Sequence, residues 1–305
     1  MNYLAIDVGG TFTKYAVVTK KCEILHKDKF PTKKEKLEEF LDSLVSVWEH
    51  CGREYEIRGI GLSMPGLIDS KRGFMYTGGL IPCISNLNIA EIMEDRCHVP
   101  VTVENDAKCA ALAELWDGAL KDHKNAVVII CGTGVGGAVI QNGEIVDGDH
   151  CVAGELSYIM TDYDSEYDSR NCMAETTGIG SLTEYVSEET GILAKDLDGV
   201  KIFSMVNQGD ERAAAGLRKY VRHIAVQIHN CRCMLDPEIF AIGGGISVQP
   251  LFLRMIREEL ERMYRVLPWK VQPPQVVTCR FFNDANLLGA VYVNMKEKER
   301  RQHDS

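Results

Sequence analysis

Apolar and polar positions follow two patterns along the chain, one typical of β-strands and one typical of helices, and segments of the two kinds alternate. Short apolar runs bounded by turn residues predict β-strands at 3–10, 13–19, 22–30, 57–64, 74–76, 99–104, 125–132, 134–141, 143–148, 238–246 and 275–279. Apolar residues spaced three and four apart predict helices at 33–51, 88–97, 106–120, 180–190, 210–235, 250–264 and 285–300. Strands that alternate with helices are typical of an α/β architecture.

The strand–turn–strand pattern that opens the chain recurs near residue 125. YLAIDVGG and TKYAVVT form the first copy, and NAVVIICG and GVGGAVIQ form the second. Such a repetition predicts two similar lobes. We expect a small α/β lobe made of 1–118 and the C-terminal helix at 286–305, and a large α/β lobe made of 119–285.

Charge and composition argue against several classes of function. The 305 residues carry a net charge of −10, and the basic run that stands out is KEKERR at 296–301. Nucleic-acid binding needs a concentrated Lys/Arg surface, so we expect none. No apolar run is long enough for a membrane span, and the first residues lack the features of a signal peptide. The irregularly spaced cysteines are typical of reduced thiols, so we expect a cytoplasmic protein.

Three glycine-rich turns follow apolar runs. They are DVGGT at 7–11, CGTGVGG at 131–137 and GGGI at 243–246. Glycine lets backbone N–H groups approach an anion, although each turn alone also fits an ordinary hairpin. GTGVGG does not match a dinucleotide fingerprint, because that motif needs a helix directly after the glycines and AVIQNGEIV predicts a β-hairpin.

Taken together, the three turns fit a nucleoside triphosphate. The hydroxyl groups of Thr11 and Thr133 are placed to donate to phosphate oxygens, and Lys14 adds a positive charge nearby. Asp7 would face Mg²⁺ directly or through water, because that ion favours carboxylate and water oxygens. The sequence contains neither a P-loop nor the protein-kinase signature set.

Asn105 and Asp106 stand where a predicted strand ends and a predicted helix begins. Asn and Asp are favoured helix N-caps, which is one sufficient explanation of the pair. The alternative is catalytic, because a carboxylate at this position can accept the proton of an attacking hydroxyl during phosphoryl transfer. The sequence leaves both interpretations open.

The ordered set DVGGT, SMPG, ENDA, GTGVGG, AGE and GGGI resembles the ROK (repressor, ORF, kinase) family of sugar kinases over essentially the whole chain. The resemblance implies an actin-like, ribonuclease-H-like fold with two lobes and a central cleft for ATP and sugar. It implies that the ATP site is formed, together with Lys14, by Asp7, Gly9, Gly10, Thr11, Gly132, Thr133, Gly134, Gly243, Gly244 and Gly245.

The same resemblance implies the residues that hold the sugar. Asp106 would be the general base for a sugar hydroxyl, usually the one at C6. Asn105, Glu155 and Glu175 would form hydrogen bonds with the sugar ring, and the backbone of Gly79 would approach it. The implied partners are therefore ATP, Mg²⁺ and a small sugar, and a homodimer is expected from the same likeness.

One segment departs from the family pattern. Many members continue AGE as GEIGH and then supply a CxCGxxGC run, and one histidine with three cysteines binds a structural zinc. Here Tyr158 replaces that histidine and only Cys172 remains of the cysteines. Because tetrahedral zinc needs four such ligands, we expect no zinc. His150 and Cys151 are out of register and fit a surface loop, and Tyr158 must supply the missing sugar contact or leave it out.

The segment after AGE is similar to that of zinc-lacking β-glucoside kinases. The likeness rests on an expected aromatic-bearing strand after Glu155 and on the AETT run at 174–177. Those enzymes phosphorylate the non-reducing glucose unit of disaccharides. Glucokinase and N-acetylmannosamine kinase remain alternatives within the family. A family repressor is not expected, because DVGGT begins at residue 7 with no DNA-binding domain before it.

Two other functions are alternatives for the chain, and one loop has two interpretations. A catalytically silent sugar sensor would not need the base Asp106, and an ATPase activator of the same fold would need cysteines placed for an iron–sulfur cluster. The polar loop at 163–171 is either a solvated excursion or a rim on which Tyr163 and Tyr167 stack against a second sugar ring.

Overall fold

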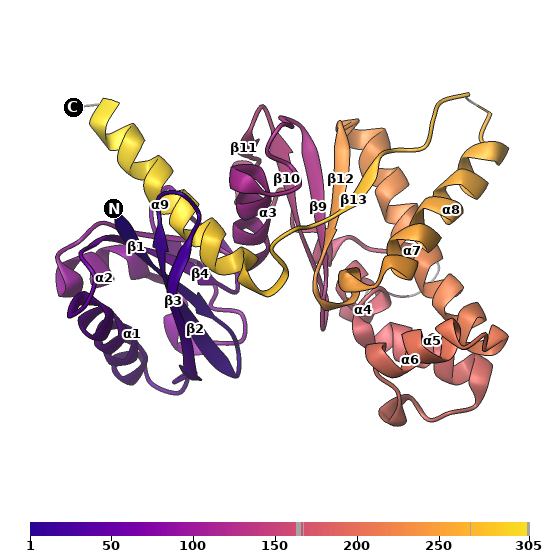
Figure 1. Ribbon diagram of the computed structural model, residues 1–305, viewed down its shortest axis with the longest axis horizontal. Coiled ribbons are helices and arrows are strands. Elements are labelled where there is room, and N and C mark those ends of the chain that lie inside the picture. The colour runs from indigo at the N-terminus through magenta and orange to yellow at the C-terminus, as the bar shows by residue number, and fades with distance from the viewer. Residues whose placement is uncertain (163–165, 167, 269, 304–305) are drawn as a thin grey trace. The chain divides into compact units, whose positions relative to one another are not determined.

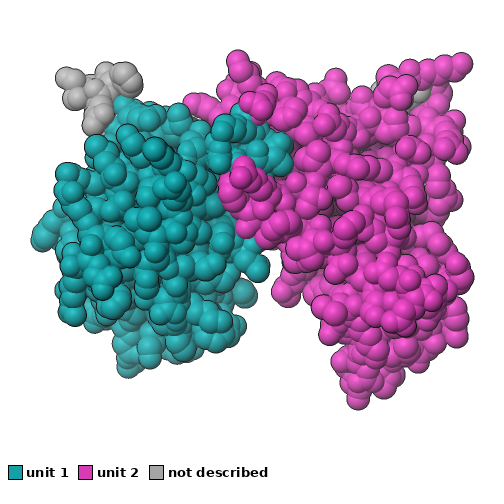
Figure 2. Space-filling view, viewed as in Figure 1, with its two compact units in different colours: residues 1–121, 147–152, 283–305 teal, residues 122–146, 153–282 magenta. Residues whose placement is uncertain are grey.

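The computed structural model describes residues 1–162, 166, 168–268 and 270–303. The chain forms two compact units, coloured teal and magenta in Figure 2. Unit 1 contains 1–121, 147–152 and 283–305, and unit 2 contains 122–146 and 153–282. The short segment 147–152 thus belongs to unit 1, although the residues on both sides of it belong to unit 2.

Unit 1 is built around a mixed five-stranded sheet of order β3-β2-β1-β4-β8. The first three strands are antiparallel neighbours, and β4 and β8 continue the sheet in parallel. The strands are β1 (Asn2–Val8), β2 (Phe12–Thr19), β3 (Ile24–Pro31), β4 (Ile57–Met64) and β8 (Val101–Asn105). A small second sheet contains β5 (Ile68–Asp69), β6 (Phe74–Met75) and β7 (Leu87–Asn88).

Helices cover both faces of the five-stranded sheet of unit 1 (Figure 1). They are α1 (Leu37–Gly52), α2 (Ile89–Cys97), α3 (Asp106–Asp117) and α9 (Ala285–His303). The apolar residues of α1 and α2 share a core with Ile60 and Leu62 of β4. On the opposite face Gly61 lets α9 approach closely, since a Cβ there would collide with the carbonyl oxygen of Ala290. This packing holds the ends of β1, β4 and β8 in place.

Unit 2 repeats the same sheet order with different strands, β11-β10-β9-β12-β13. Again an antiparallel three-stranded part is extended by two parallel strands. The strands are β9 (Ala126–Cys131), β10 (Val135–Gln141), β11 (Glu144–Ile145), β12 (Ile239–Gly243) and β13 (Val276–Thr278). The repetition of the sheet agrees with the strand–turn–strand repeat seen in the sequence.

The core of unit 2 lies between this sheet and its helices. The helices are α4 (Met173–Thr176), α5 (Ile179–Thr190), α6 (Gly199–Asn207), α7 (Glu211–Leu235) and α8 (Pro250–Val266). Tyr220 of α7 and Phe252 of α8 are fully buried and pack together with ring centroids 6.1 Å apart. No helix of the described residues is long and apolar enough to cross a membrane.

Most of the expected elements are present, but α6 was not expected and the strand expected at 143–148 is reduced to β11. Helix α1 begins at Leu37 rather than at residue 33, after the N-cap Lys36. The expected strand after Glu155 is wrong, because Leu156–Tyr158 forms a 3₁₀ turn in which the Tyr158 N–H donates to the Glu155 carbonyl oxygen at 3.2 Å. Gly154 precedes this turn with a φ of 80°, a left-handed conformation that interrupts an extended strand.

Candidate active site

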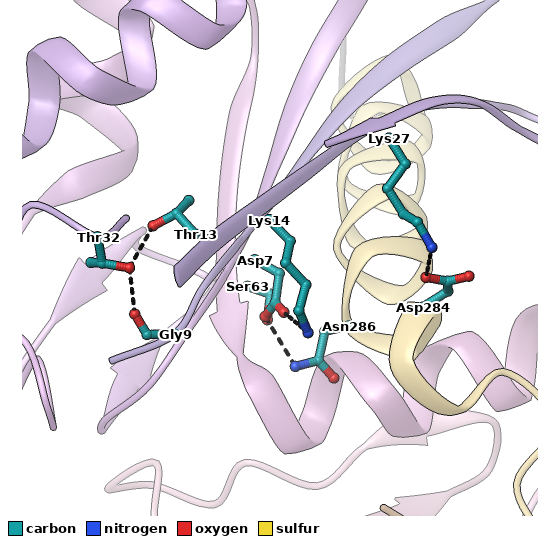
Figure 3. Close-up of polar contacts among 9 residues, drawn as sticks. All are labelled: Asp7, Gly9, Thr13, Lys14, Lys27, Thr32, Ser63, Asp284 and Asn286. Carbon is teal, nitrogen blue, oxygen red and sulfur yellow. Dashed lines mark hydrogen bonds and ion pairs between the residues drawn. The ribbon is translucent and has the colours of Figure 1, made fainter. Parts of the chain in front are cut away.

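Asp7 lies at the end of β1 and is held by three side chains of unit 1 (Figure 3). Ser63 Oγ donates to Asp7 Oδ1 at 2.8 Å, and Asn286 Nδ2 donates to the same oxygen at 3.0 Å. The ammonium of Lys14 lies 3.6 Å from Asp7 Oδ2. The strand register explains two of these contacts, since Asp7 is the direct neighbour of Lys14 on β2 and of Ser63 on β4.

Thr32, the residue after β3, binds the first glycine turn (Figure 3). Thr32 Oγ1 donates to the Gly9 carbonyl oxygen at 2.7 Å and also lies 3.0 Å from Thr13 Oγ1. Lys34 Nζ donates to the Gly10 carbonyl oxygen at 3.4 Å. These bonds occupy backbone oxygens of the turn and leave the side chain of Thr11 exposed.

The structure assigns the helix cap, which the sequence placed at the Asn105–Asp106 pair, to Asn105. Asn105 is the N-cap of α3, and its Oδ1 accepts from the N–H groups of Ala107 at 2.9 Å and Lys108 at 3.3 Å. Its Nδ2 donates to the Gly66 carbonyl oxygen at 3.1 Å. Asp106 is the first helical residue, so its carboxylate is not needed as the cap.

The carboxyl group of Asp106 has a strongly perturbed acidity. Burial raises its pKa to about 6, the Ala107 N–H opposes that rise, and the neighbouring Asp7 carboxylate adds to it. The Ala107 N–H donates to Asp106 Oδ1 at 2.8 Å. A carboxyl of this kind is mostly ionised at neutral pH and is a better proton acceptor than an ordinary aspartate.

A second charged cluster, made of Glu104, Lys108 and Asp147, lies near the start of α3. Lys108 is 1% exposed, and its ammonium lies 2.9 Å from Asp147 Oδ1 in the segment 147–152. Glu104 is also buried, and its pKa is raised to about 7 by burial, against the lowering effect of the Lys108 charge. The cluster ties the start of α3 to segment 147–152.

Gly79 lies in a tightly folded loop of unit 1. It has a φ of 55°, and a Cβ added there would lie 3.2 Å from the Cβ of Pro65 and 3.3 Å from the Gly66 nitrogen. Because Asn105 binds the carbonyl oxygen of Gly66, the Gly79 loop is connected to the residue that caps α3. Asn105 therefore links the Gly79 loop to the helix that Asp106 begins.

The two glycine turns of unit 2 lie side by side. Gly244 has a φ of 87°, and a Cβ there would collide with the carbonyl oxygen of Cys131, the residue before the other turn. Gly243 packs likewise against Ile130 and Cys279. In contrast, a Cβ at Gly245 would meet nothing within 4 Å, and one at Gly132 or Gly134 would make only ordinary contacts at 3.7 Å. Packing explains the first two glycines but not the other three.

The expected sugar-binding residues of unit 2 stand on two short elements that are joined by hydrogen bonds. Glu155 precedes the 3₁₀ turn Leu156–Tyr158, Tyr158 itself is 76% exposed, and Glu175 is exposed on α4. The Met173 N–H donates to the Ile159 carbonyl oxygen at 2.8 Å. This bond connects the end of the turn to the start of α4.

The segment where the family resemblance would place a zinc site carries few metal-binding side chains. His150 is exposed, Cys151 is half-buried and Cys172 is buried. Among the described residues, no group of three or more His, Cys, Asp or Glu side chains is placed to hold a metal ion. Tyr163 and Tyr167, proposed as a stacking rim, lie outside the described residues.

Some of the predicted site residues belong to unit 1 and the others to unit 2. Unit 1 brings Asp7 and Lys14 together and holds Asn105 beside the Gly79 loop. Sequence reasoning missed Ser63 and Asn286 as partners of Asp7. Ser63 belongs to SMPG, which had been noted as a motif, whereas nothing in the sequence singles out Asn286 near the start of the last helix.

Comparison with known proteins places the chain in a family. The ROK family model matches residues 3–297. The β-glucoside kinase of Listeria monocytogenes is 30% identical over 99% of this chain and 100% of its own length. The N-acetyl-D-glucosamine kinase of Vibrio atlanticus is 28% identical over 96% of this chain and 100% of its own. A crystal structure of a ROK family protein from Streptococcus pneumoniae with sucrose has a TM-score of 0.87 and 30% identity, covering 98% and 100% of the two chains.

The fold and the site therefore define a two-lobed sugar kinase of the actin-like class. The chain belongs to the ROK family, and within it to the ATP-dependent sugar kinases.

Proposed function

We propose that this protein transfers the γ-phosphoryl group of ATP to the 6-hydroxyl of a hexose, or of the non-reducing glucosyl unit of a β-glucoside, with Asp106 as the general base. The observation that carries the proposal is the Asp106 carboxyl, which is freed from capping by Asn105 and has a pKa raised to about 6. Asp106 takes the hydroxyl proton while the sugar oxygen bonds to the γ-phosphorus. The bond from that phosphorus to the β-phosphate oxygen breaks, and ADP leaves.

The three glycine turns and Lys14 bind the phosphates. The open space at Gly134 and Gly245 supports this role, because an anion can approach the backbone there without meeting a side chain. Thr11 and Thr133 add hydroxyl donors, and Gly243 and Gly244 hold their turn against the end of β9. Lys14 is already near the site through its contact with Asp7.

The residues around Asp7 fit Mg²⁺ held through water. Asp7 Oδ1 accepts two hydrogen bonds, and Asp7 Oδ2 faces the Lys14 ammonium. Because both oxygens already have partners, the carboxylate suits a hydrogen bond to metal-coordinated water better than direct coordination of the ion. When bound, Mg²⁺ would neutralise charge on the phosphates. Ser63 and Asn286 fix the orientation of Asp7 for this purpose. We propose no structural zinc, since Tyr158 and the lone Cys172 cannot supply its ligands.

The sugar is held by Asn105, Glu155, Glu175, the Gly79 backbone and Tyr158. Asn105 retains one amide N–H beyond the one given to Gly66, and this N–H is available for a sugar hydroxyl. Glu155 and Glu175 are acceptors for neighbouring hydroxyls of the ring. The exposed Tyr158 offers its ring face to sugar or to an attached second unit.

The similarity to β-glucoside kinases favours a glucosyl unit as the acceptor. N-acetyl-D-glucosamine is a second candidate, because a kinase of that name is 28% identical over nearly the whole chain. The proposed setting is the cytoplasm, and the proposed assembly is a homodimer, which light scattering of the purified protein would test.

A coupled ADP-release assay tests the proposal. The acceptors are glucose, mannose, fructose, N-acetylglucosamine, N-acetylmannosamine, cellobiose and gentiobiose, each with ATP and Mg²⁺. We expect turnover with a β-glucoside or a hexose and phosphate at C6 of the product by NMR. No turnover with any acceptor, combined with sugar-dependent thermal stabilisation, would instead support the sensor.

A further inference from the structure

The junction between α4 and α5 packs directly against the glycine turn that follows β9. Gly178 lies at this junction, after the helix that carries Glu175. A methyl group at position 178 would lie 2.5 Å from the Thr133 carbonyl oxygen and 2.7 Å from the Ala174 carbonyl oxygen. Gly178 has φ −75° and ψ 173°, which any residue adopts. The site therefore requires glycine for space and not for conformation.

Hydrogen bonds join the turn and the junction. The Ile179 N–H donates to the Gly132 carbonyl oxygen at 3.1 Å, and the Gly132 N–H donates to the Gly134 carbonyl oxygen at 2.9 Å. On the other side of Gly178, the buried Tyr220 hydroxyl donates to the Thr177 carbonyl oxygen at 2.8 Å. The junction consequently cannot move away from the turn without breaking bonds on both sides.

We infer that Gly178 is a positioning residue that couples ATP binding at Thr133 to sugar binding at Glu175, an inference that rests on the proposed roles of these two residues. The contact is between backbone atoms, and no flexible side chain lies between them to absorb a shift. Close-packed interiors transmit such displacements. A change in the position of α4 when sugar binds therefore reaches the phosphate-binding turn, and the reverse also holds because coupling between binding sites is reciprocal.

Gly178→Ala and Gly180→Ala form a matched pair that tests the inference. A Cβ at Gly180 would meet nothing within 4 Å, so the same methyl group is harmless two residues further along. We expect Gly178→Ala to lower kcat/KM for both sugar and ATP by roughly 10- to 100-fold, the cost of misplacing bound groups by about 1 Å. It should also abolish the effect of sugar on nucleotide affinity. Gly180→Ala should keep wild-type values.

A second pair breaks the hydrogen bond between the junction and the turn. Ile179 is the first residue of α5, where proline is tolerated, and the extended Gly178 suits a residue before proline. Ile179→Pro deletes the N–H that binds Gly132 and puts its ring Cδ toward that carbonyl oxygen, whereas Ile179→Ala loses the side chain but keeps the N–H. We expect Ile179→Pro to weaken binding of a non-hydrolysable ATP analogue at least about fivefold relative to Ile179→Ala, because the loss of one hydrogen bond alone is worth about that factor.

Calorimetry with this analogue, without and with sugar, gives the deciding comparison. Wild-type nucleotide affinity in Gly178→Ala, or equal behaviour of the two glycine variants, would overturn the inference. If Gly178→Ala does not fold, an unchanged affinity in Ile179→Pro overturns it instead. Absence of sugar turnover in the wild-type protein contradicts the proposed function, but the nucleotide affinities measured without sugar still decide the link between turn and junction.

Discussion

The acidity of Asp106 follows from its place at the start of a helix inside a buried site. Asn105 supplies the cap, and the Asp106 carboxylate accepts a hydrogen bond from the Ala107 N–H within its own turn. One hydrogen bond does not offset burial and the nearby Asp7 charge, and the pKa rises to about 6. Burial, the Asp7 charge and the Ala107 N–H together give Asp106 a pKa suited to a proton acceptor at neutral pH.

Asp106→Asn should abolish catalysis without harming the fold. The amide oxygen can still accept the Ala107 N–H, but it cannot take a proton from the sugar hydroxyl. We expect kcat to fall by roughly 10²- to 10⁴-fold, while nucleotide affinity measured by calorimetry stays at the wild-type value. Asp95→Asn, an exposed carboxylate on α2, is the control. A kcat within a factor of about three of wild type would remove Asp106 from the role of base.

The pH dependence of activity should report the same carboxyl. Since the base must be ionised, log kcat/KM should be flat near neutral pH and fall with unit slope below about pH 6, the raised pKa of Asp106. The measurement is the initial rate at low sugar concentration in buffers of constant ionic strength. A bend near pH 4, the value of an ordinary aspartate, would contradict the assignment.

Stability should show the opposite trend with pH. The folded protein holds the Asp106 proton up to about pH 6, whereas the unfolded chain releases it near pH 4. Folding therefore binds a proton in this window, and the free energy of unfolding contributed by Asp106 decreases as pH rises through it. Urea titrations of wild type and Asp106→Asn at pH 4.5 and 7 test this. The variant should gain stability relative to wild type at the higher pH.

At the scale of elements, the ends of three neighbouring strands collect the polar residues of unit 1. Asp7 and Ser63 come from β1 and β4, and Asn105 ends β8. These three strands are parallel, so their carboxyl ends meet at one edge, where ligands bind in open α/β sheets. Asn286 reaches Asp7 from α9, whose approach to the sheet depends on Gly61.

The loop between the 3₁₀ turn and α4 is closed at its base by hydrogen bonds. Met160 and Cys172 form an antiparallel bridge. Thr161 Oγ1 donates to the Asn171 carbonyl oxygen at 2.8 Å and lies 3.0 Å from Thr176 Oγ1 on α4. These bonds hold α4, and with it Glu175, beside the turn that follows Glu155.

Thr161→Val should loosen this closure while keeping the shape of the side chain. We expect the sugar KM to rise roughly fivefold, because the lost hydroxyl contacts are together worth about 1 kcal/mol, with kcat little changed since Asp106 is untouched. Steady-state kinetics at saturating ATP provide the measurement. Thr183→Val, which removes a 2.7 Å hydroxyl bond within α5, is the control. An equal KM in the two variants would show that the loop base does not position Glu175.

At the scale of the whole molecule, each unit has its own five-stranded sheet, and the chain enters unit 1 three times. The return at 147–152 is fastened by the Lys108–Asp147 ion pair. Burying an ammonium that is 1% exposed carries a large desolvation cost. Removing Lys108 takes a positive charge away from both the Asp147 and the Glu104 carboxyl groups.

Lys108→Met should therefore lower the free energy of unfolding by about 3 kcal/mol, and Lys108→Met with Asp147→Leu should recover much of that loss. Urea unfolding of both variants is the measurement. Lys121→Met is the control, because the Lys121–Asp117 pair is a surface pair with 58% and 35% exposed side chains, worth less than about 1 kcal/mol. Equal losses for the two single variants would argue against a buried charge clamp.

The sequence by itself determined the features that depend on neighbouring residues. Apolar periodicity defined the strands of both five-stranded sheets, the glycine turns were visible as motifs, and Asn105 could be recognised as a cap. The 3₁₀ turn after Glu155 was missed because Gly154 adopts a positive φ within an apparently extended segment.

Tertiary structure decided the features that depend on packing across the chain. Asn286 meets Asp7 only because α9 lies on β1 and β4, and Lys108 meets Asp147 only because segment 147–152 returns to unit 1. Gly178 looks like an ordinary helix-start glycine until Thr133 and Ala174 are placed around it. Periodicity and turn preferences are local energies, whereas burial and shifted acidity arise from residues that only the folded chain brings together.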